Sequence, residues 1–347
     1  MYNPFVGIYK FLLALLVVAI HVEPFSGDLA FYTNQCLARI AVPSFFVLSS
    51  YFLFDKLIHN NWDIKIFFKN ELHLAKYYGI WLLLHSPVVL IRLWDTATDI
   101  PNFIWLVFQA ITLKGPYGAL WFLPATMMAV ALVYLIGKKW GPYPCLFISF
   151  PFFLFAALET EYFACIKHIE WMEVLNEYFT AIFGWLANGL HFGFFFCSIG
   201  FYIACTKEKK RTLSLDVIKI ILSVILLFTE TTIIRDYKLG VSYGAMLFLI
   251  PTVYYIVRIL LRLPASSNKS LNAGARYLQH LSLLIYPMHF AIMELLEFVL
   301  RNNKTYMNNT CLQYVVVCSI NLFLGAIILY LGEKRNLKVA KLLYGKA

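Results

Sequence analysis

The chain has 347 residues, of which 61% are hydrophobic and only 14% are charged. Soluble domains carry about 25% charged residues, so this composition excludes an ordinary soluble domain and favours a membrane protein. The formal net charge of +10 would suit nucleic-acid binding. The basic residues, however, lie in short segments between apolar runs, which is the positive-inside pattern of membrane proteins, and we expect no nucleic-acid partner.

Apolar runs recur along the whole chain, each near the length of about 20 residues that a helix needs to cross a lipid bilayer. We therefore predict an all-α polytopic membrane protein, with a single transmembrane domain over residues 1–347 and no soluble domain. The predicted spans, about ten in number, are 5–22, 36–54, 73–92, 118–137, 143–159, 180–205, 214–234, 241–261, 278–300 and 312–332.

The loops between these spans alternate in charge. Lys138, Lys139 and Lys334 belong to a basic set, whereas Asp95 and Glu170 belong to an acidic set. Because basic loops stay in the cytoplasm, the pattern predicts that both termini are cytoplasmic. We expect a multi-pass protein of a cell membrane.

The first predicted span contains two ionisable residues, Lys10 and His21. Eleven steps of about 100° bring the two side chains within about 20° of the same helix face, about 16 Å apart along the axis. An ionisable residue inside a bilayer costs at least ~2.5 kcal/mol, so it usually faces a cavity or a partner. The pair predicts a polar passage, with Lys10 near the cytoplasmic side and His21 near the outer side.

Further polar residues fall mainly in the outer halves of the predicted spans, which predicts a shared, partly hydrated chamber near His21. They are Arg39, Asn188, His191, Glu230, Ser282, Tyr286 and His289. A neutral imidazole can take a proton from a hydroxyl that attacks a carbonyl, and Glu230 could orient that imidazole. Lys10 could hold an anion, such as the phosphates of a coenzyme. A structural interpretation stays open beside this one, in which the histidines form internal hydrogen bonds and Glu230 reaches the membrane interface.

The sequence lacks the motifs that are typical of several kinds of binding and catalysis. It contains neither a nucleotide-binding glycine loop nor a Gly-x-Ser-x-Gly elbow, and its potential metal ligands are not clustered. The seven cysteines are scattered without a Cys-x-x-Cys pair, which favours buried apolar roles over redox chemistry. We expect no metal and no permanently bound cofactor.

The sequence resembles a known family, the acyltransferase-3 family of ten-span membrane O-acyltransferases. The family has an arginine, ten residues and a histidine in its first span, where this chain has Lys10, ten residues and His21. Four further phrases are similar to family motifs and follow in the same order. They are RIAVPSFFVLSSY at 39–51, LWFLPA at 120–125, NGLHFGFFF at 188–196 and SLLIYPMH at 282–289. The subgroup that it most resembles is Gram-positive and includes the membrane domain of vancomycin-resistance-type serine racemases.

The resemblance implies acyl transfer in a bacterial plasma membrane, from cytoplasmic acyl-CoA to a hydroxyl of a cell-surface glycan or envelope precursor. Acetyl is the expected acyl group, and acyl-CoA is a co-substrate. By this resemblance, His21 is the catalytic base or a transient acyl carrier. Lys10 occupies the position of the family's arginine, which is thought to bind the donor. Supporting or substrate-binding roles fall to Arg39, Trp121, Asn188, His191, Ser282, Tyr286 and His289.

Lys10 is a departure from the family pattern, because lysine keeps the charge but loses the planar, bidentate fork of arginine. Either donor binding is altered, or this member of the family no longer acts as an enzyme. The alternative function is therefore a transporter or export partner, which would move a small solute, such as an amino acid, or a glycan precursor along the same polar passage. The sequence does not predict an oligomeric state.

Overall fold

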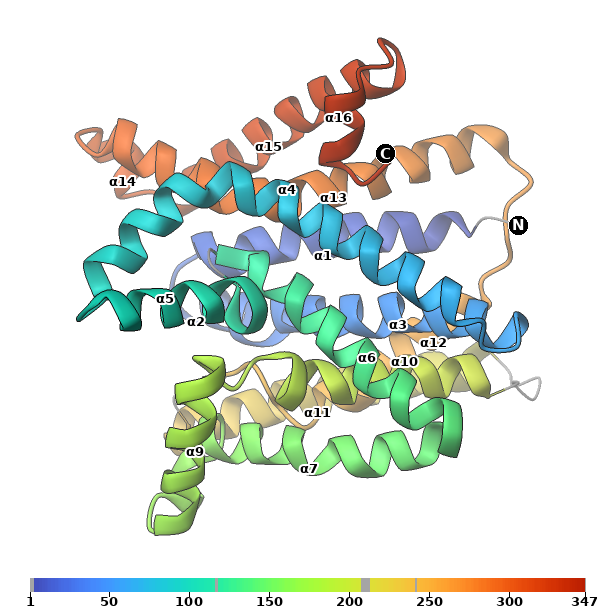
Figure 1. Cartoon of the computed structure of the whole chain (residues 1–347), viewed down its shortest axis with the longest axis vertical. Coiled ribbons are helices and arrows are strands. Elements are labelled where there is room, and N and C mark those ends of the chain that lie inside the picture. Colours follow the sequence, from blue (N-terminus) through green and yellow to red (C-terminus); the bar gives the residue numbers. More distant parts are fainter. Residues whose placement is uncertain (1–2, 116–117, 207–212, 241, 347) are drawn as a thin grey trace. The chain divides into compact units, whose positions relative to one another are not determined.

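The structure is a computed structural model that describes residues 3–115, 118–206, 213–240 and 242–346 (Figure 1). Every regular element in these ranges is a helix, in agreement with the predicted all-α class. The chain divides into two compact units, one formed by Met1–Phe45 with Ile256–Ala347 and the other by Phe46–Tyr255. We call them the first and the second unit and describe each separately. The prediction of one domain over the whole chain stays a prediction.

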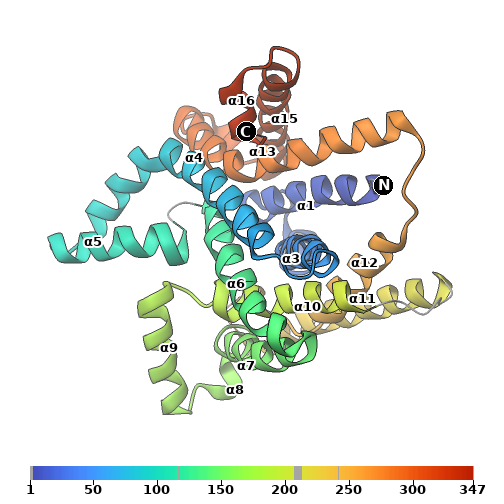
Figure 2. The same ribbon diagram turned by 45° about the vertical axis from the view of Figure 1, so that its right-hand side comes forward.

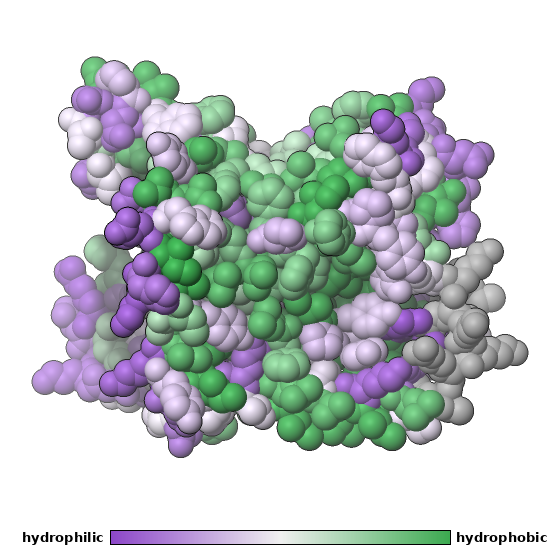
Figure 3. Space-filling model, turned by 90° about the horizontal axis from the view of Figure 1, so that it is seen from below, coloured by the Kyte–Doolittle hydropathy of each residue, from purple (hydrophilic) through white to green (hydrophobic). Residues whose placement is uncertain are grey.

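Eight helical segments of the described ranges are long and apolar enough to cross a membrane. They are Pro4–Val22, Gly27–His59, Ile64–Thr96, Gly118–Trp140, Pro142–Thr160, Ser214–Asp236, Lys269–Leu300 and Thr310–Glu333. Each overlaps a predicted span, and hydrophobic residues cover much of the face seen in Figure 3. The chain is thus a multi-pass membrane protein, while the count of ten spans and the cytoplasmic placement of the termini stay predictions.

The predicted span 180–205 is not one helix, so its start was wrong. Helix α9 (Glu170–Phe183) ends at Gly184, which has a left-handed φ of +78°. A new helical segment then runs through η5 (Gly189–Gly193) into α10 (Phe194–Cys205). The side chain of Asn188 starts this segment by accepting the first backbone N–H groups, and such a cap is worth about 1 kcal/mol.

The predicted span 241–261 is also shorter in the structure. Helix α12 runs from Leu249 to Arg262, only 14 residues, and residues 242–248 before it are mostly irregular. Position 241 lies outside the described residues. Irregular backbone in an apolar surrounding needs partners for its N–H groups, and here two buried carboxylates supply them: Glu161 bonds Gly244, and Glu230 bonds Leu247 and Phe248.

The first unit is built around helix α1 (Pro4–Val22), which lies alongside α13 (Lys269–Leu300) in both ribbon views (Figures 1 and 2). Helix α15 (Thr310–Glu333) packs against both of them. The other elements of this unit are α2 (Gly27–Tyr32), η1 (Thr33–Leu37), η2 (Ala38–Ile40), α14 (Lys304–Met307), α15 (Thr310–Glu333) and α16 (Lys338–Leu343).

Two polar contacts fix the rotation of α1 about its axis. The hydroxyls of Tyr9 and Ser44 lie 2.9 Å apart, and the Tyr314 hydroxyl donates to the carbonyl of Leu15 at 3.2 Å. Between them, Leu13 is buried in an apolar cluster. These contacts determine which face of α1 turns toward α13.

The second unit is packed through aromatic side chains and close backbone approaches. Its helices are α4 (Ile64–Thr96), α5 (Ile100–Gln109), η3 (Ala110–Lys114), η4 (Gly118–Trp121), α6 (Phe122–Trp140), α7 (Pro142–Thr160), α8 (Phe163–Ile166), α9, η5, α10 and α11 (Leu213–Asp236). Helices α3 (Ala41–His59) and α12 each cross from one unit to the other. Gly200 lies so close to Ser50 and to the Val47 carbonyl that a Cβ atom would collide with both.

Candidate active site

The first unit brings His21 and His289 together. His21 lies in the last turn of α1, and His289 lies in the second half of α13. Their ring centroids are 5.3 Å apart, and the ring planes are tilted by 30°. The ring of Phe290 packs against that of His21 in a T-shaped arrangement, with the centroids 5.3 Å apart and an interplanar angle of 87°. The pair joins residues that are 268 positions apart in the sequence.

The tautomer of His289 follows from its hydrogen bond. Its ring Nδ1 lies 3.0 Å from the backbone carbonyl of Ile285, one helical turn earlier. A carbonyl oxygen only accepts, so Nδ1 carries the proton and Nε2 presents a lone pair. His289 is only 1% exposed, and its Nε2 has no hydrogen-bond partner among the described residues. A buried acceptor thus lies beside the ring of His21.

Ser282 and Tyr286 share a helix face with His289. The three residues are spaced by four and three positions, which places them on one side of α13. Ser282 is buried, and its hydroxyl donates to the carbonyl of Gln279 at 2.7 Å. Tyr286 is half-buried. The structure therefore places these three predicted site residues on the face of α13 that carries the histidine pair.

Lys10 and Arg39 belong to the same unit as the pair. Helix α1 is uninterrupted from Lys10 to His21, so the spacing of about 16 Å along the axis applies. Lys10 is half-buried. Arg39 lies in η2, an element that packs against α1, and its guanidinium donates to Oε1 of Gln35 at 2.5 and 3.2 Å.

Glu230 belongs to the second unit, where both of its carboxylate oxygens are in use. Oε1 accepts from the Tyr162 hydroxyl and from the Leu247 N–H at 2.6 Å, and Oε2 accepts from the Phe248 N–H at 2.8 Å. These bonds hold the irregular segment before α12. The role of Glu230 in orienting a catalytic imidazole stays a prediction.

Glu161 is a buried carboxylate that sequence reasoning missed. It is 0% exposed, and its carboxylate accepts hydrogen bonds from the Gly244 N–H at 2.6 Å and from the Thr160 hydroxyl. Burial raises the pKa of Glu161 above its ordinary value of 4.5, while these hydrogen bonds act in the opposite direction. An acidic residue directly after an apolar run was the available signal, but its partner lies 83 positions away.

Asn188, His191 and Trp121 lie in the second unit among aromatic rings. Asn188 is fully buried; it accepts the N–H groups of Leu190 and His191, each at 2.9 Å, and donates to the Trp185 carbonyl at 2.7 Å. The ring centroids around that of His191 lie at 4.4 to 6.0 Å and belong to Phe152, Phe155, Phe179 and Phe183. The Trp121 ring meets that of Trp185 at 5.3 Å. These contacts stabilise the packing of this unit, and substrate-binding roles for the three residues stay predictions.

The fold and this site define the class of the protein, a helical multi-pass membrane protein with a histidine pair between two of its helices. Residues 3–330 match the acyltransferase-3 family, which is described as an acyltransferase domain. The chain belongs to this family, as its motifs suggested. No solved structure matches it.

Curated relatives come from enterococci. An amino-acid racemase of Enterococcus faecalis is 24% identical over 337 residues, which are 96% of this chain and 46% of the relative. A serine/alanine racemase of Enterococcus gallinarum is 24% identical over 354 residues, or 97% of this chain and 47% of the relative. The chain therefore spans about half the length of the curated relatives that it matches.

Proposed function

We propose that the chain is a membrane O-acyltransferase. It moves an acyl group, expected to be acetyl, from cytoplasmic acyl-CoA to a hydroxyl of a cell-surface glycan or envelope precursor. Membership of an acyltransferase family supports the reaction class. The observation that carries the assignment to a site is the pair formed by the exposed His21 and the buried His289.

In one form of the reaction, His21 is a general base. Its neutral imidazole takes the proton of the acceptor hydroxyl as the oxygen attacks the thioester carbonyl, and the tetrahedral intermediate expels the coenzyme A thiolate, which receives that proton. In the other form, a nitrogen of His21 attacks the thioester carbonyl first, expels the coenzyme A thiolate and carries the acyl group. The acceptor hydroxyl then attacks the acyl-imidazole, the imidazole leaves, and the hydroxyl proton goes to the thiolate. Both forms need an imidazole held in a defined orientation.

His289 is suited to hold His21 in that orientation. Its Nδ1 proton is committed to Ile285, so Nε2 can only accept, and it can receive a hydrogen bond from an N–H of His21. The other nitrogen of His21 would then be the basic one. We assign His289 as a positioning residue, with Ser282 and Tyr286 beside it on the same face.

Lys10 would bind the donor from the cytoplasmic side. Its ammonium is a compact charge suited to a phosphate, about 16 Å from His21 along α1. The phosphopantetheine arm has about twelve bonds between sulfur and phosphate, equal to about four extended residues or ~14 Å. An extended arm therefore matches the distance between the two residues.

The test replaces His21 by alanine and analyses surface glycans and envelope precursors by mass spectrometry. We expect the acyl modification to disappear, whereas His73→Ala, an exposed histidine of α4, should leave it unchanged. Acylation that persists at its normal level in His21→Ala cells would overturn the proposed function.

The names of the relatives favour a second candidate, the movement of a small amino acid through the first unit. Uptake of labelled serine and alanine into vesicles that contain the purified chain separates the two functions. Uptake that requires His21 in vesicles, without any acylated product in cells, would support transport in place of acyl transfer.

A further inference from the structure

A polar pocket of about 410 Å³ lies in the first unit, between the start of α13 and the C-terminal tail. The groups that matter for its chemistry are Lys269, Asn272, Arg276, His280, Glu333 and Lys346. None of them belongs to the histidine pair. The pocket is therefore a separate feature that the proposed reaction does not use.

The charge of this pocket favours an anion. Lys269 and Arg276 are seven positions apart, so they point to the same side of α13. Lys269 also lies in the first turn, where the helix dipole favours anions and disfavours cations. A lysine at this position opposes local stability, which is expected when it serves a negatively charged ligand.

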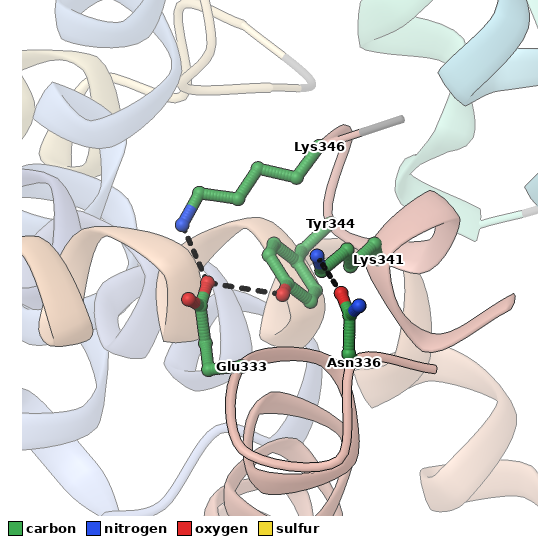
Figure 4. A network of polar contacts seen from close by, with 5 residues as sticks. All are labelled: Glu333, Asn336, Lys341, Tyr344 and Lys346. Carbon is green, nitrogen blue, oxygen red and sulfur yellow. Dashed lines mark hydrogen bonds and ion pairs between the residues drawn. The ribbon is translucent and has the colours of Figure 1, made fainter. Parts of the chain in front are cut away.

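The acidic residue of the lining, Glu333, is already paired (Figure 4). Its Oε1 lies 2.5 Å from the Lys346 ammonium and accepts from the Tyr344 hydroxyl at 3.1 Å. The ring of Tyr344 lies 5.4 Å from that of His280, so the tail folds against α13. The lining holds three basic side chains, Lys269, Arg276 and Lys346, and one acidic side chain, Glu333, so its formal charge is positive.

The orientation of the pocket favours a ligand other than the acyl donor. His280 precedes His289 by nine positions, or about 900°, which places the two side chains on opposite faces of α13. Arg276 precedes His289 by thirteen positions, which is a rotation of about 140° from it. A donor bound here would have to pass its arm around α13 to reach His21.

The surroundings of the pocket fit a lipid. Exposed apolar side chains of α15 lead toward Glu333 at a spacing of four and three residues: Phe323, Ile327 and Tyr330. Tyr277, which lines the pocket, is 44% exposed, and tyrosine is typical of membrane interfaces. Basic pockets between transmembrane helices bind the headgroups of anionic lipids.

We propose that this pocket binds the phosphate headgroup of an anionic membrane lipid, with the acyl chains along the exposed face of α15. The charge pattern of the loops predicts that this end of α13 lies in the cytoplasmic leaflet. Such a lipid would hold the C-terminal tail against α13. The proposal is independent of whether the chain transfers acyl groups.

The experiment titrates the purified full chain, in a neutral detergent, with phosphatidylglycerol or phosphatidylcholine and measures the thermal unfolding temperature. We expect phosphatidylglycerol alone to raise it, because a ligand stabilises the state that binds it. Lys269→Gln should require about fivefold more phosphatidylglycerol for the same shift. Its unfolding temperature without lipid should not fall, since the lysine opposes the helix dipole.

Lys338→Gln is the matched control, because this exposed lysine lies in α16 outside the pocket. The proposal is overturned if both lipids act equally, or if Lys269→Gln responds like Lys338→Gln. Inorganic phosphate and acetyl-CoA, each tested in phosphatidylcholine, distinguish the sources of phosphate. A shift with either one that is lost in Lys269→Gln would assign the pocket to a soluble phosphate ligand and also overturn the lipid.

Discussion

The ring centroid of His21 lies 5.3 Å from that of His289, and the Nδ1 proton of His289 is committed to the carbonyl of Ile285. His289 can therefore only accept a hydrogen bond through its Nε2, and His21 would be the donor. A histidine pair with only a structural role would not require Nε2 of His289 to be an acceptor. This difference can be measured.

Replacing His289 tests its positioning role. Glutamine reaches the place of Nε2 and offers a carbonyl oxygen there, whereas asparagine reproduces only the Nδ1 side. We expect both variants to fold, His289→Asn to lose activity by about 10²-fold, and His289→Gln to lose less. The measurement is acyl transfer from labelled acetyl-CoA in membranes, at equal protein levels. Equal losses in both variants would show that the acceptor atom has no such role.

Lys10 is tested by a pair of substitutions. Lys10→Arg restores the family's residue and should keep or improve the use of acyl-CoA, because the guanidinium binds phosphate through two parallel hydrogen bonds. Lys10→Ala should raise KM for acyl-CoA about tenfold or more, since a hydrogen bond to a charged group contributes ~1.5–3 kcal/mol. Equal KM values for the three proteins would remove Lys10 from the donor site.

Glu230 is expected to stabilise the second unit. Glu230→Ala leaves the N–H groups of Leu247 and Phe248 without their acceptor, at a cost of ~3 kcal/mol in the free energy of unfolding. Glu177→Ala removes an exposed carboxylate of α9 in the same unit and should change stability by less than ~0.5 kcal/mol. Denaturant unfolding in detergent compares the two. If the two variants are equally stable, the hydrogen bonds of Glu230 do not hold this segment.

The burial of Glu161 predicts a pH dependence of stability. Because folding raises the pKa of Glu161, the folded state holds this proton more tightly than the unfolded state. The stabilisation is complete below the ordinary pKa of 4.5 and is lost as the pH rises through the folded pKa. Glu161→Gln stays neutral and can still accept from the Gly244 N–H, so its unfolding temperature should fall less than that of the wild type as the pH rises above 4.5. A wild-type protein with the same pH profile as this variant would contradict the prediction.

Much of the first unit could be predicted from the sequence because the signals are local. The apolar run of residues 5–22 gave one helix, and its period alone places Lys10 and His21 on a shared face. The motif at 282–289 placed Ser282, Tyr286 and His289 on one face of a second helix for the same reason. Five such phrases in order suggested the family, and the match of residues 3–330 confirmed it.

Other features depend on partners that are distant in the sequence, and only the tertiary structure decided them. An apolar run cannot show that Gly184 ends a helix and that Asn188 starts the next one. Nor can a carboxylate at the end of a span show whether it reaches water, a histidine or a backbone N–H, and Glu230 bonds the segment before α12. The meeting of His21 with His289 likewise required the packing of α1 against α13. Helical period determines which side chains share a face, whereas the partner of that face depends on how the helices pack.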